Sequence, residues 1–171
     1  DVYKRKADDM LTTTVMACPC KKMISPAMNH NMYHNPIVQD NIRKLERFGY
    51  EMIAPDRGML ANGDDGDGRM PEPEVLFEYI LRELAFEKDL AGKNVLVTAG
   101  ATMEAIDPVR YITNHSSGKM GCAVAKAAMQ RGAKVTLVAG HMEVLPPMFV
   151  DVVNVKSAAD MFEAVTKLAP E

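Results

Sequence analysis

Two apolar runs separated by a helix-length segment constrain the fold of this chain most strongly. The runs are "NVLVTAG" (residues 94–100) and "AKVTLVAG" (residues 133–140), and each ends at a glycine. Runs that are apolar at successive positions are typical of strands buried on both faces of a parallel sheet. Between them we expect a helix that ends at Gly132, with one face formed by Met120, Ala123, Val124, Ala127 and Ala128. A strand, a helix and a strand in this order predict an α/β fold with right-handed crossovers.

The first half of the chain repeats this alternation. "CKKMISPAM" predicts a short strand that ends near a proline, and "YEMIAP" predicts the next strand. Between them a helix is expected, with Asn35 as its N-cap, Pro36 in its first turn and Gly49 after its end. Its apolar positions are Val38, Ile42, Leu45 and Phe48.

Two further helices are predicted. Residues 75–86 return to helical spacing, with Leu76, Tyr79, Ile80 and Leu84 on one face. Ser157 can cap a last helix that carries Met161, Val165 and Leu168. The pattern breaks at "EKDLAGK", so we place a domain boundary near residues 87–93, with one domain over residues 1–88 and the next over residues 89–171.

The bulk composition is globular. The 171 residues are 47% hydrophobic and 25% charged, which suits one ordinary domain or two small ones. The net charge of −3 argues against a nucleic-acid partner, and no apolar stretch approaches the roughly 18 residues of a membrane span. The three cysteines are too few for a disulfide framework, and Cys18 and Cys20 have the wrong spacing for a redox pair. We therefore expect a cytoplasmic protein. Because the sequence opens on Asp, we expect it to be a piece of a longer chain.

Ligands of parallel α/β sheets bind at the carboxyl ends of the strands. Loops rich in polar residues and glycine follow three of the predicted strands: "SPAMNHNMY" (residues 25–33), "DRGMLANGDDGDGRMPEP" (residues 56–73) and "AGATMEAIDPVRYITNHSSGKMG" (residues 99–121). We therefore look for the functional site in these loops.

The last loop predicts an anion site. It resembles a P-loop, but Thr113 replaces the first glycine of that motif and Met120 follows the lysine, so the P-loop interpretation fails. Ser116, Ser117 and Gly118 stand at a helix N-terminus, which favours a phosphate or an acyl phosphate. The alternative is that a serine only caps the helix. Further polar or turn-forming residues in the loop are Gly100, Asp107, Arg110 and Asn114, although Asp107 and Arg110 could form a solvated pair of little value.

The other two loops offer no clear metal site. The acidic loop fails the EF-hand spacing in both registers, from Asn62 and from Asp65, so its glycines are expected to permit tight turns near a ligand. His30 and His34 have the spacing of a zinc pair on a helix, but Asn35 and the proline after it indicate that both precede the helix. No third ligand is evident in the sequence, so no metal site is predicted.

The motifs "SPAMNHNMY", "GDDGDGRMPEPE" and "DPVRYITNHSSGKMG" closely resemble a known family. This family comprises the bifunctional coenzyme A biosynthesis proteins, in which phosphopantothenoylcysteine decarboxylase is fused to phosphopantothenate–cysteine ligase. The motifs occur in the family's order over nearly the whole chain. The resemblance implies a flavodoxin-like decarboxylase half followed by the start of a Rossmann-like ligase domain.

For the ligase, the resemblance implies that CTP converts 4′-phosphopantothenate into an acyl-cytidylate, which the amine of cysteine attacks, with Mg²⁺ as the metal. Asn114 would contact the acyl-cytidylate and Arg110 would help to bind or convert it. The residues implied in binding nucleotide or anion are Gly100, Ala101, Thr102, Asp107, Ser116, Ser117, Gly118 and Lys119.

For the decarboxylase, the resemblance implies FMN as the cofactor and residues 60–73 as a flap over the substrate. Asn29 would bind the substrate carboxylate, and the implied substrate-binding residues are Pro26, Ala27, Met28, Asn29, Met32, Arg69 and Met70. Asn62 stands where the family has a flap cysteine that acts as an acid, which predicts that the final reduction is slow or uses another acid. The catalytic histidine of the family would precede residue 1, and the later ligase residues would follow Glu171. The resemblance also implies a homo-oligomer, with a ligase dimer and a decarboxylase trimer or dodecamer.

Two alternatives remain open. "VLVTAG" ends a strand as in a NAD(P)-binding Rossmann module, although Gly100 is followed by Ala101 and Thr102 and the complete glycine motif is absent. The altered flap would also suit a non-catalytic, flavoprotein-like regulatory subunit.

Overall fold

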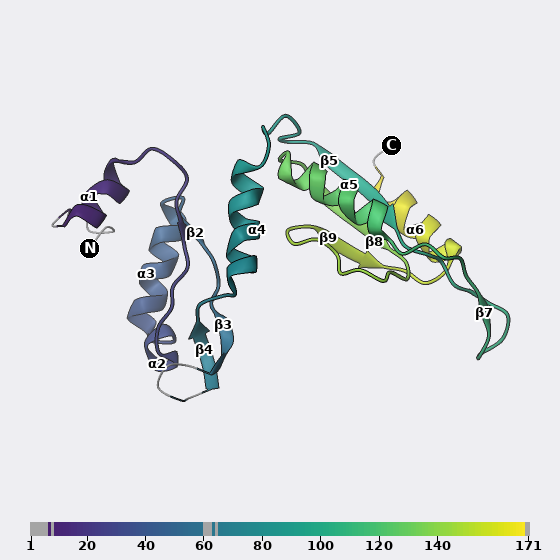
Figure 1. Cartoon of the computed structure of the whole chain (residues 1–171), viewed down its shortest axis with the longest axis horizontal. Helices are drawn as coiled ribbons and strands as arrows, with labels where there is room; N and C mark the ends of the chain where they lie inside the picture. The colour runs from purple at the N-terminus through teal and green to yellow at the C-terminus, as the bar shows by residue number, and fades with distance from the viewer. Residues whose placement is uncertain (1–6, 8, 60–62, 64, 170–171) are drawn as a thin grey trace. The chain divides into compact units, whose positions relative to one another are not determined.

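The computed structural model describes residues 7, 9–59, 63 and 65–169 and divides the chain into two compact units, Asp1–Val75 and Leu76–Glu171 (Figure 1). The domain boundary expected at residues 88 and 89 stays a prediction.

The first unit contains two small pairs of strands. β1 pairs in parallel with β2, with Met23 opposite Glu51, and β3 pairs antiparallel with β4. The elements of this unit are α1 (Met10–Ala17), β1 (Met23–Ile24), α2 (His30–Tyr33), α3 (Pro36–Arg47), β2 (Glu51–Met52), β3 (Asp56–Met59) and β4 (Asp65–Arg69).

Local sequence signals account for α3. The Asn35 side chain accepts a hydrogen bond from the Ile37 N–H at 2.9 Å, and Pro36 occupies the first turn, where a missing N–H costs nothing. Gly49 follows the helix with φ of 83°, a left-handed conformation that favours glycine. The predicted cap, first turn and stop of this helix are confirmed. α1 was not predicted, although Asp9 and Thr12 form a capping box at its start.

The loop expected over residues 56–73 is in part a β-hairpin, which corrects the sequence interpretation. β3 and β4 pair from Asp56 opposite Arg69 to Met59 opposite Asp65. The strand "DGDGR" has no apolar alternation, and its glycines carry low β-propensity. Backbone pairing and close contact with α2, rather than a side-chain pattern, form this hairpin.

The second unit contains a parallel sheet in the order β5-β8-β9 and a separate hairpin of β6 and β7. α4 (Pro73–Leu84) begins in the first unit and lies mostly in the second. The other elements are β5 (Asn94–Ala99), β6 (Glu104–Ala105), β7 (Tyr111–Ile112), α5 (Lys119–Gln130), β8 (Lys134–Ala139), β9 (Asp151–Asn154) and α6 (Ala158–Leu168). The predicted α/β class with parallel sheets is confirmed.

β8 forms the centre of the core. Val135, Leu137, Val138 and Ala139 are buried, and because neighbouring residues of a strand face opposite sides, both faces of β8 are covered. α5 packs on β5 and β8, and α6 contacts β8. Ser157 and Asp160 form a capping box at the start of α6, which confirms the predicted cap.

The predicted apolar face of α5 is wrong except at Ala128, which is buried. Met120 and Val124 are exposed, by 83% and 51%, and Ala123 and Ala127 are exposed as well. The other residues that the helix buries are Cys122, Ala125, Met129 and Gln130. Small residues let the helix axis approach the sheet closely, so the alanine and cysteine stripe faces the core. Helical spacing alone does not show whether this stripe or the adjacent one, which carries Met120 and Val124, faces the core.

Among the described helices, none combines the length and the apolar character that a membrane span requires.

Candidate functional site

A cavity of about 400 Å³ lies at the carboxyl end of β5, beside the start of α5. This is the place where parallel α/β sheets bind ligands. The lining combines hydroxyl groups, glycine backbone and one lysine: Thr98, Ala99, Gly100, His115, Ser116, Ser117, Gly118, Lys119, Met120, Gly121 and Met161. The structure therefore brings together five of the residues predicted to bind an anion: Gly100, Ser116, Ser117, Gly118 and Lys119.

Gly121 brings the helix to the strand at this cavity. A Cβ atom at this position would lie 2.5 Å from the Ala99 Cβ and 2.7 Å from the Thr98 carbonyl oxygen. No side chain fits, so glycine is what allows the first turn of α5 to touch the end of β5. The sequence analysis missed this residue, although a glycine inside a helical pattern is itself a sign of close packing.

The start of α5 has no side-chain cap. Gly118 is the N-cap residue, with φ of 78°, and no side chain bonds to the first turn. The N–H of Cys122 is the first to bond back into the helix, to the Gly118 carbonyl oxygen at 3.0 Å. This overturns the alternative that Ser116 or Ser117 serves as the cap. The first N–H groups of the helix, with the positive end of its dipole, remain available to an anion.

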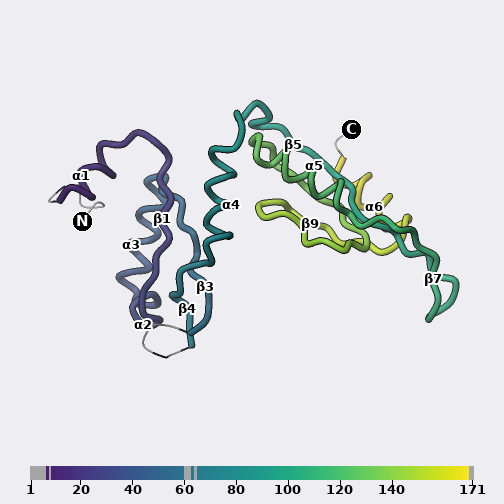
Figure 2. Tube along the Cα trace, viewed as in Figure 1, coloured from purple at the N-terminus to yellow at the C-terminus, as the bar shows by residue number. Residues whose placement is uncertain are grey.

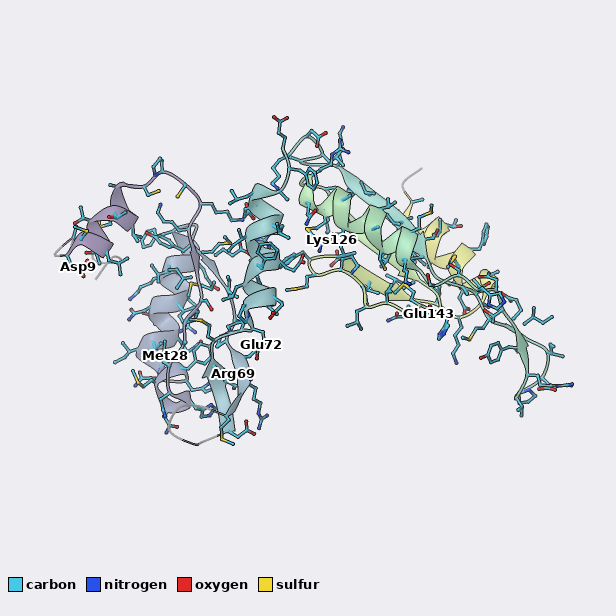
Figure 3. All side chains as sticks on the ribbon, viewed as in Figure 1. Asp9, Met28, Arg69, Glu72, Lys126 and Glu143 are labelled. Carbon is cyan, nitrogen blue, oxygen red and sulfur yellow. The ribbon has the colours of Figure 1, made fainter. Side chains whose placement is uncertain are left out.

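Local hydrogen bonds fix the loop before the helix. Oδ1 of Asn114 accepts from the Ser116 N–H at 2.9 Å, and the Ser117 carbonyl oxygen accepts from the Glu143 N–H at 3.1 Å. Glu143 is labelled in Figure 3. Because the Asn114 oxygen is engaged, its amide group is left to donate to a ligand. Asn114 does not itself line the cavity, but it orients the serines that do.

Gly100 turns the chain at the end of β5. Its φ is 84°, and a Cβ would collide with the carbonyl oxygen of His141. The next residue, Ala101, is buried and exchanges backbone hydrogen bonds with His141 at 2.7 and 2.9 Å. The Thr102 carbonyl oxygen accepts from the Thr113 hydroxyl at 2.8 Å. Ala101 and Thr102 thus support the site and do not line the cavity.

Asp107 and Arg110 lie on the β6–β7 hairpin, which projects beyond the end of the sheet (Figure 2). They form an ion pair at 2.6 Å, with the Arg110 side chain 72% exposed. N–H groups of Arg110 and Val109, and then the Arg110 guanidinium, lower the pKa of Asp107. The structure does not bring this pair to the cavity lining, so their predicted roles stay predictions.

The β5–α5 connection also bears on the dinucleotide alternative. In a dinucleotide fold a short glycine turn leads from the strand directly into the helix. Here the β6–β7 hairpin lies between the end of β5 at Ala99 and the start of α5 at Lys119. This connection argues against a NAD(P)-binding module.

In the first unit, the "PAMN" segment (residues 26–29) lies against the hairpin strand β4. The Met28 N–H donates to the Gly68 carbonyl oxygen at 2.9 Å, and a side chain at Gly68 would collide with the Met28 carbonyl oxygen. Gly68 has φ of 131°, which also favours glycine. The two loops predicted to form the decarboxylase site are therefore joined through their backbones.

The predicted substrate-binding side chains differ in their surroundings. Asn29 caps α2 by accepting from the Asn31 N–H at 2.9 Å, which leaves its amide group to donate. Arg69 pairs with Glu72 (Figure 3). Met32 and Met70 are exposed by 58% and 51%, Pro26 and Met28 are half-buried, and Ala27 is exposed. Asn62 lies outside the described residues, so its role is not tested.

Ser25, directly before this segment, was also missed. Its hydroxyl oxygen is the one buried side-chain oxygen or nitrogen without a partner in the part of the chain that the structure describes. A buried hydroxyl of this kind suits a hydrogen bond to a bound group.

The expectation about the histidines needs correction. His30 and His34 precede α3, as predicted, but His30 begins the short helix α2 and His34 caps its end. Asp67 of β4 supplies the third group that the sequence did not reveal, within reach of both rings. This cluster is distinct from the residues of the predicted sites.

The fold and the cavity define an α/β protein with parallel sheets and an exposed helix start suited to an anion. The "Flavoprotein" family matches residues 7–85, and the "DNA/pantothenate metabolism flavoprotein C-terminal domain" family matches residues 90–171. The chain belongs to the family of the coenzyme A biosynthesis bifunctional proteins.

Similar proteins carry that name in several bacteria. The chain is 49% identical over 158 residues to the coenzyme A biosynthesis bifunctional protein CoaBC of Haemophilus influenzae, covering 92% of this chain and 40% of that protein. It is 52% identical to the same protein of Vibrio vulnificus, covering 96% of this chain and 41% of that protein. For the Mycobacterium bovis protein the identity is 47%, with the same two shares covered. The chain thus spans about 40% of the length of these relatives.

Solved structures resemble parts of the chain. A crystal structure of the C-terminal domain of CoaBC is 55% identical, covers 46% of this chain and 40% of its own, and has a TM-score of 0.45. A PPC decarboxylase variant complexed with pantothenoylaminoethenethiol is 30% identical, covers 46% and 44%, and also has a TM-score of 0.45.

Proposed function

We propose that the protein containing this chain ligates 4′-phosphopantothenate to cysteine with CTP and then decarboxylates the product, 4′-phosphopantothenoylcysteine, in coenzyme A biosynthesis. The membership of the chain in the bifunctional family supports this proposal. The observation that carries the ligase part is the uncapped start of α5, which opens on a cavity with two serines and a lysine.

The ligase reaction needs groups that bind concentrated negative charge. Activation of the carboxylate joins it to the α-phosphate of CTP and releases pyrophosphate, after which the cysteine amine displaces CMP. In the proposal, the N–H groups of the first α5 turn and the hydroxyls of Ser116 and Ser117 bind phosphate oxygens, and Lys119 adds a positive charge. Asn114 donates its free amide N–H to the acyl-cytidylate, while Arg110 binds or converts it from the β6–β7 hairpin.

The cavity lining contains no carboxylate among the described residues, so it does not fit a Mg²⁺ ion held by protein ligands. In the proposal the ion enters as a counter-ion of the nucleotide.

The decarboxylase part rests on the first unit. One feature of this unit suits a bound FMN: the buried hydroxyl of Ser25, beside the "PAMN" segment, has no hydrogen-bond partner. FMN, when bound, would supply the redox chemistry that makes decarboxylation feasible. The residues of this chain would bind the substrate: Asn29 would donate its amide to the carboxylate, and the β3–β4 hairpin would hold Met28 in place through the bond from the Met28 N–H to the Gly68 carbonyl oxygen.

The test compares two serine-to-aspartate variants of the full-length protein that contains this chain. Ser117→Asp places a negative charge at the cavity, so the KM for CTP or 4′-phosphopantothenate is expected to rise at least about tenfold in a pyrophosphate-release assay. Ser157→Asp is the matched control, because it adds the same charge at the N-cap of α6, where aspartate is also a favoured cap. Equal kinetics for both variants would remove the proposed anion site.

A NADH titration separates the alternatives. Saturable NADH binding at the cavity, lost in Ser117→Asp, would favour a NAD(P)-binding module over the ligase. Absence of both pyrophosphate release and product decarboxylation in the flavin-loaded full-length protein would favour the non-catalytic regulatory subunit.

A further inference from the structure

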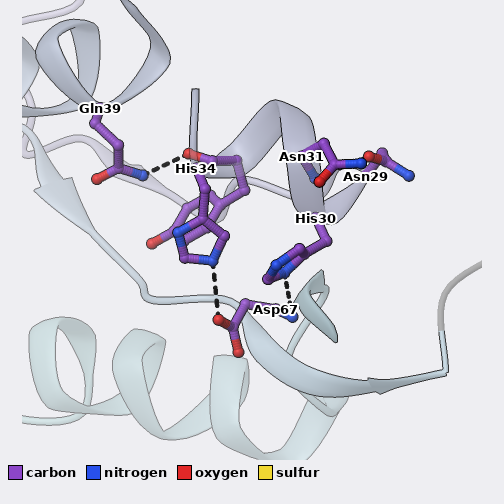
Figure 4. A network of polar contacts seen from close by, with 7 residues as sticks. Asn29, His30, Asn31, His34, Gln39 and Asp67 are labelled. Carbon is purple, nitrogen blue, oxygen red and sulfur yellow. Dashed lines mark hydrogen bonds and ion pairs between the residues drawn. The ribbon is translucent and has the colours of Figure 1, made fainter. Parts of the chain in front are cut away.

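His30, His34 and Asp67 form a cluster of potential metal ligands outside the predicted substrate-binding residues (Figure 4). His30 begins α2, His34 caps its C-terminal end, and Asp67 comes from the hairpin strand β4. One ligand atom from each residue lies within 4.8 Å of the other two. His34 Nε2 is already 3.0 Å from Asp67 Oδ2, and the two imidazole rings have centroids 4.4 Å apart.

Backbone contacts hold the cluster together without a metal. The Asp67 N–H donates to Nδ1 of His30 at 3.1 Å. A Cβ on the neighbouring Gly66 would lie 2.9 Å from the His30 ring, so only glycine allows this approach. The hydrogen bond from the Met28 N–H to the carbonyl oxygen of Gly68, the residue after Asp67, also holds β4 in place. These backbone contacts therefore place the Asp67 carboxylate next to α2.

We propose that His30, His34 and Asp67 bind a divalent transition-metal ion of the zinc class. Imidazole nitrogen and carboxylate oxygen are the ligands that zinc takes from proteins, whereas calcium and magnesium prefer oxygen alone. Bonds of about 2.0–2.1 Å in tetrahedral geometry separate the ligand atoms by about 3.3 Å. The His34–Asp67 pair is close to that separation, and the widest pair must close by no more than about 1.5 Å. Rotation of half-exposed side chains supplies such a movement.

The ion would bind three protein groups and keep a position for water. The side chains of His34 and Asp67 are 49% and 42% exposed, so solvent reaches the cluster. Because His30 and His34 lie at the two ends of α2 and Asp67 lies in β4, the bound ion would cross-link α2 to β4.

The hydrogen bond from the Asp67 N–H to Nδ1 of His30 provides a specific reporter of metal binding. A neutral imidazole has one nitrogen with a proton and one with a free lone pair. If the metal takes Nδ1 of His30, it displaces the Asp67 N–H directly. If it takes Nε2, the proton moves to Nδ1, which then no longer accepts. In both cases the Asp67 amide loses its acceptor, so its backbone NMR resonance should shift on metal binding.

The test is a calorimetric titration of the full chain with Zn²⁺ in a Cys18→Ser/Cys20→Ser background. That background is needed because the two thiols, whose sulfur atoms lie 2.7 Å apart, would bind zinc themselves. We expect one equivalent to bind and the Asp67 amide resonance to shift. Affinity should fall more than about tenfold in each of His30→Asn, His34→Asn and Asp67→Asn, because removal of even an outer-shell partner costs that much.

The other two histidines of the chain give a matched control. His115→Asn/His141→Asn removes the same number of imidazoles and should bind zinc as the background does. A zinc-dependent rise in melting temperature, reversed by a chelator, should accompany binding and be absent in His30→Asn/His34→Asn. The proposal is overturned if the background binds no zinc, or if the His30→Asn/His34→Asn variant binds as tightly as the background. In that case His34 and Asp67 form only an exposed hydrogen-bonded pair.

Discussion

Replacing Gly121 by alanine has two effects of opposite sign on the free energy of unfolding. In a helix interior, alanine is favoured over glycine by about 1 kcal/mol, so propensity alone predicts a more stable protein. The new Cβ would, however, lie 2.5 Å from the Ala99 Cβ, 2.7 Å from the Thr98 oxygen and 3.0 Å from the Ala99 Cα. Two of these atoms belong to the backbone of β5, which cannot rotate away. Overpacking of this kind costs about 1–3 kcal/mol, and the rigid partners favour the upper end of that range.

The expected net result of Gly121→Ala is a loss of about 1–2 kcal/mol in the unfolding free energy of the second unit. Urea unfolding followed by far-UV circular dichroism measures it, since the chain contains no tryptophan. Ala123→Gly, on the exposed side of the same helix, calibrates propensity alone and should cost about 1 kcal/mol. A Gly121→Ala variant that is more stable than the parent would falsify the packing argument, because propensity would then outweigh the contact.

The same substitution has a consequence at the cavity. Opening the closest contact to the 3.0 Å that real Cβ atoms require moves the first turn of α5 away from β5 by about 0.5 Å. The N–H groups of that turn would move with it. If the proposed function holds, binding of CTP or 4′-phosphopantothenate should therefore weaken in Gly121→Ala and remain unchanged in Ala123→Gly, which a KM measurement on the full-length protein can compare.

Three further outcomes are expected. Leu137→Ala, at a fully buried position of β8, should lower the unfolding free energy by about 2–5 kcal/mol in the same urea assay. Ser157→Ala should cost about 1 kcal/mol through loss of the α6 cap, and a loss below 0.3 kcal/mol would contradict that role. Backbone and side-chain hydrogen bonds from Ser157, and then the Lys156 N–H, lower the pKa of Asp160. The Asp160 carboxylate therefore stabilises the fold fully above pH 3.8, and this stabilisation is lost as the pH falls through the lowered pKa. Acid unfolding of Asp160→Asn should lack this component, and an identical acid-unfolding curve would refute it.

The sequence predicted elements whose signals are local. Asn35, Pro36 and Ser157 specify their helix starts through short-range hydrogen bonds and fixed backbone angles, and each was found where expected. The residues predicted to bind an anion, Ser116 to Lys119, also line one cavity, because the carboxyl end of a parallel strand and the start of the next helix meet by topology.

Features that depend on tertiary contact were not predictable. The β3–β4 hairpin contains "DGDGR", whose glycines and aspartates are typical of a loop, and backbone pairing with β3 together with contact with α2 gives it strand geometry. The buried face of α5 was assigned to Met120 and Val124, because spacing does not show which of two adjacent stripes fits a close helix–strand contact. Asp67 is separated from His34 by 33 residues, so no local pattern could have joined it to the histidines.

The uncapped start of α5 limits how this protein could be made more stable. A designer would normally place serine, asparagine or aspartate at a helix N-cap, but over glycine these residues gain only a few tenths of a kcal/mol, and Gly118 has φ of 78°, which favours glycine. Any such side chain would compete with an incoming anion for the same N–H groups, in addition to meeting the Met142 side chain at 2.6 Å. Thermostability screens should therefore avoid this position, or be run with the anion present. Under the proposed function the bound anion would itself accept from these N–H groups, so the liganded protein has no unmet hydrogen bonds there for a side-chain cap to satisfy.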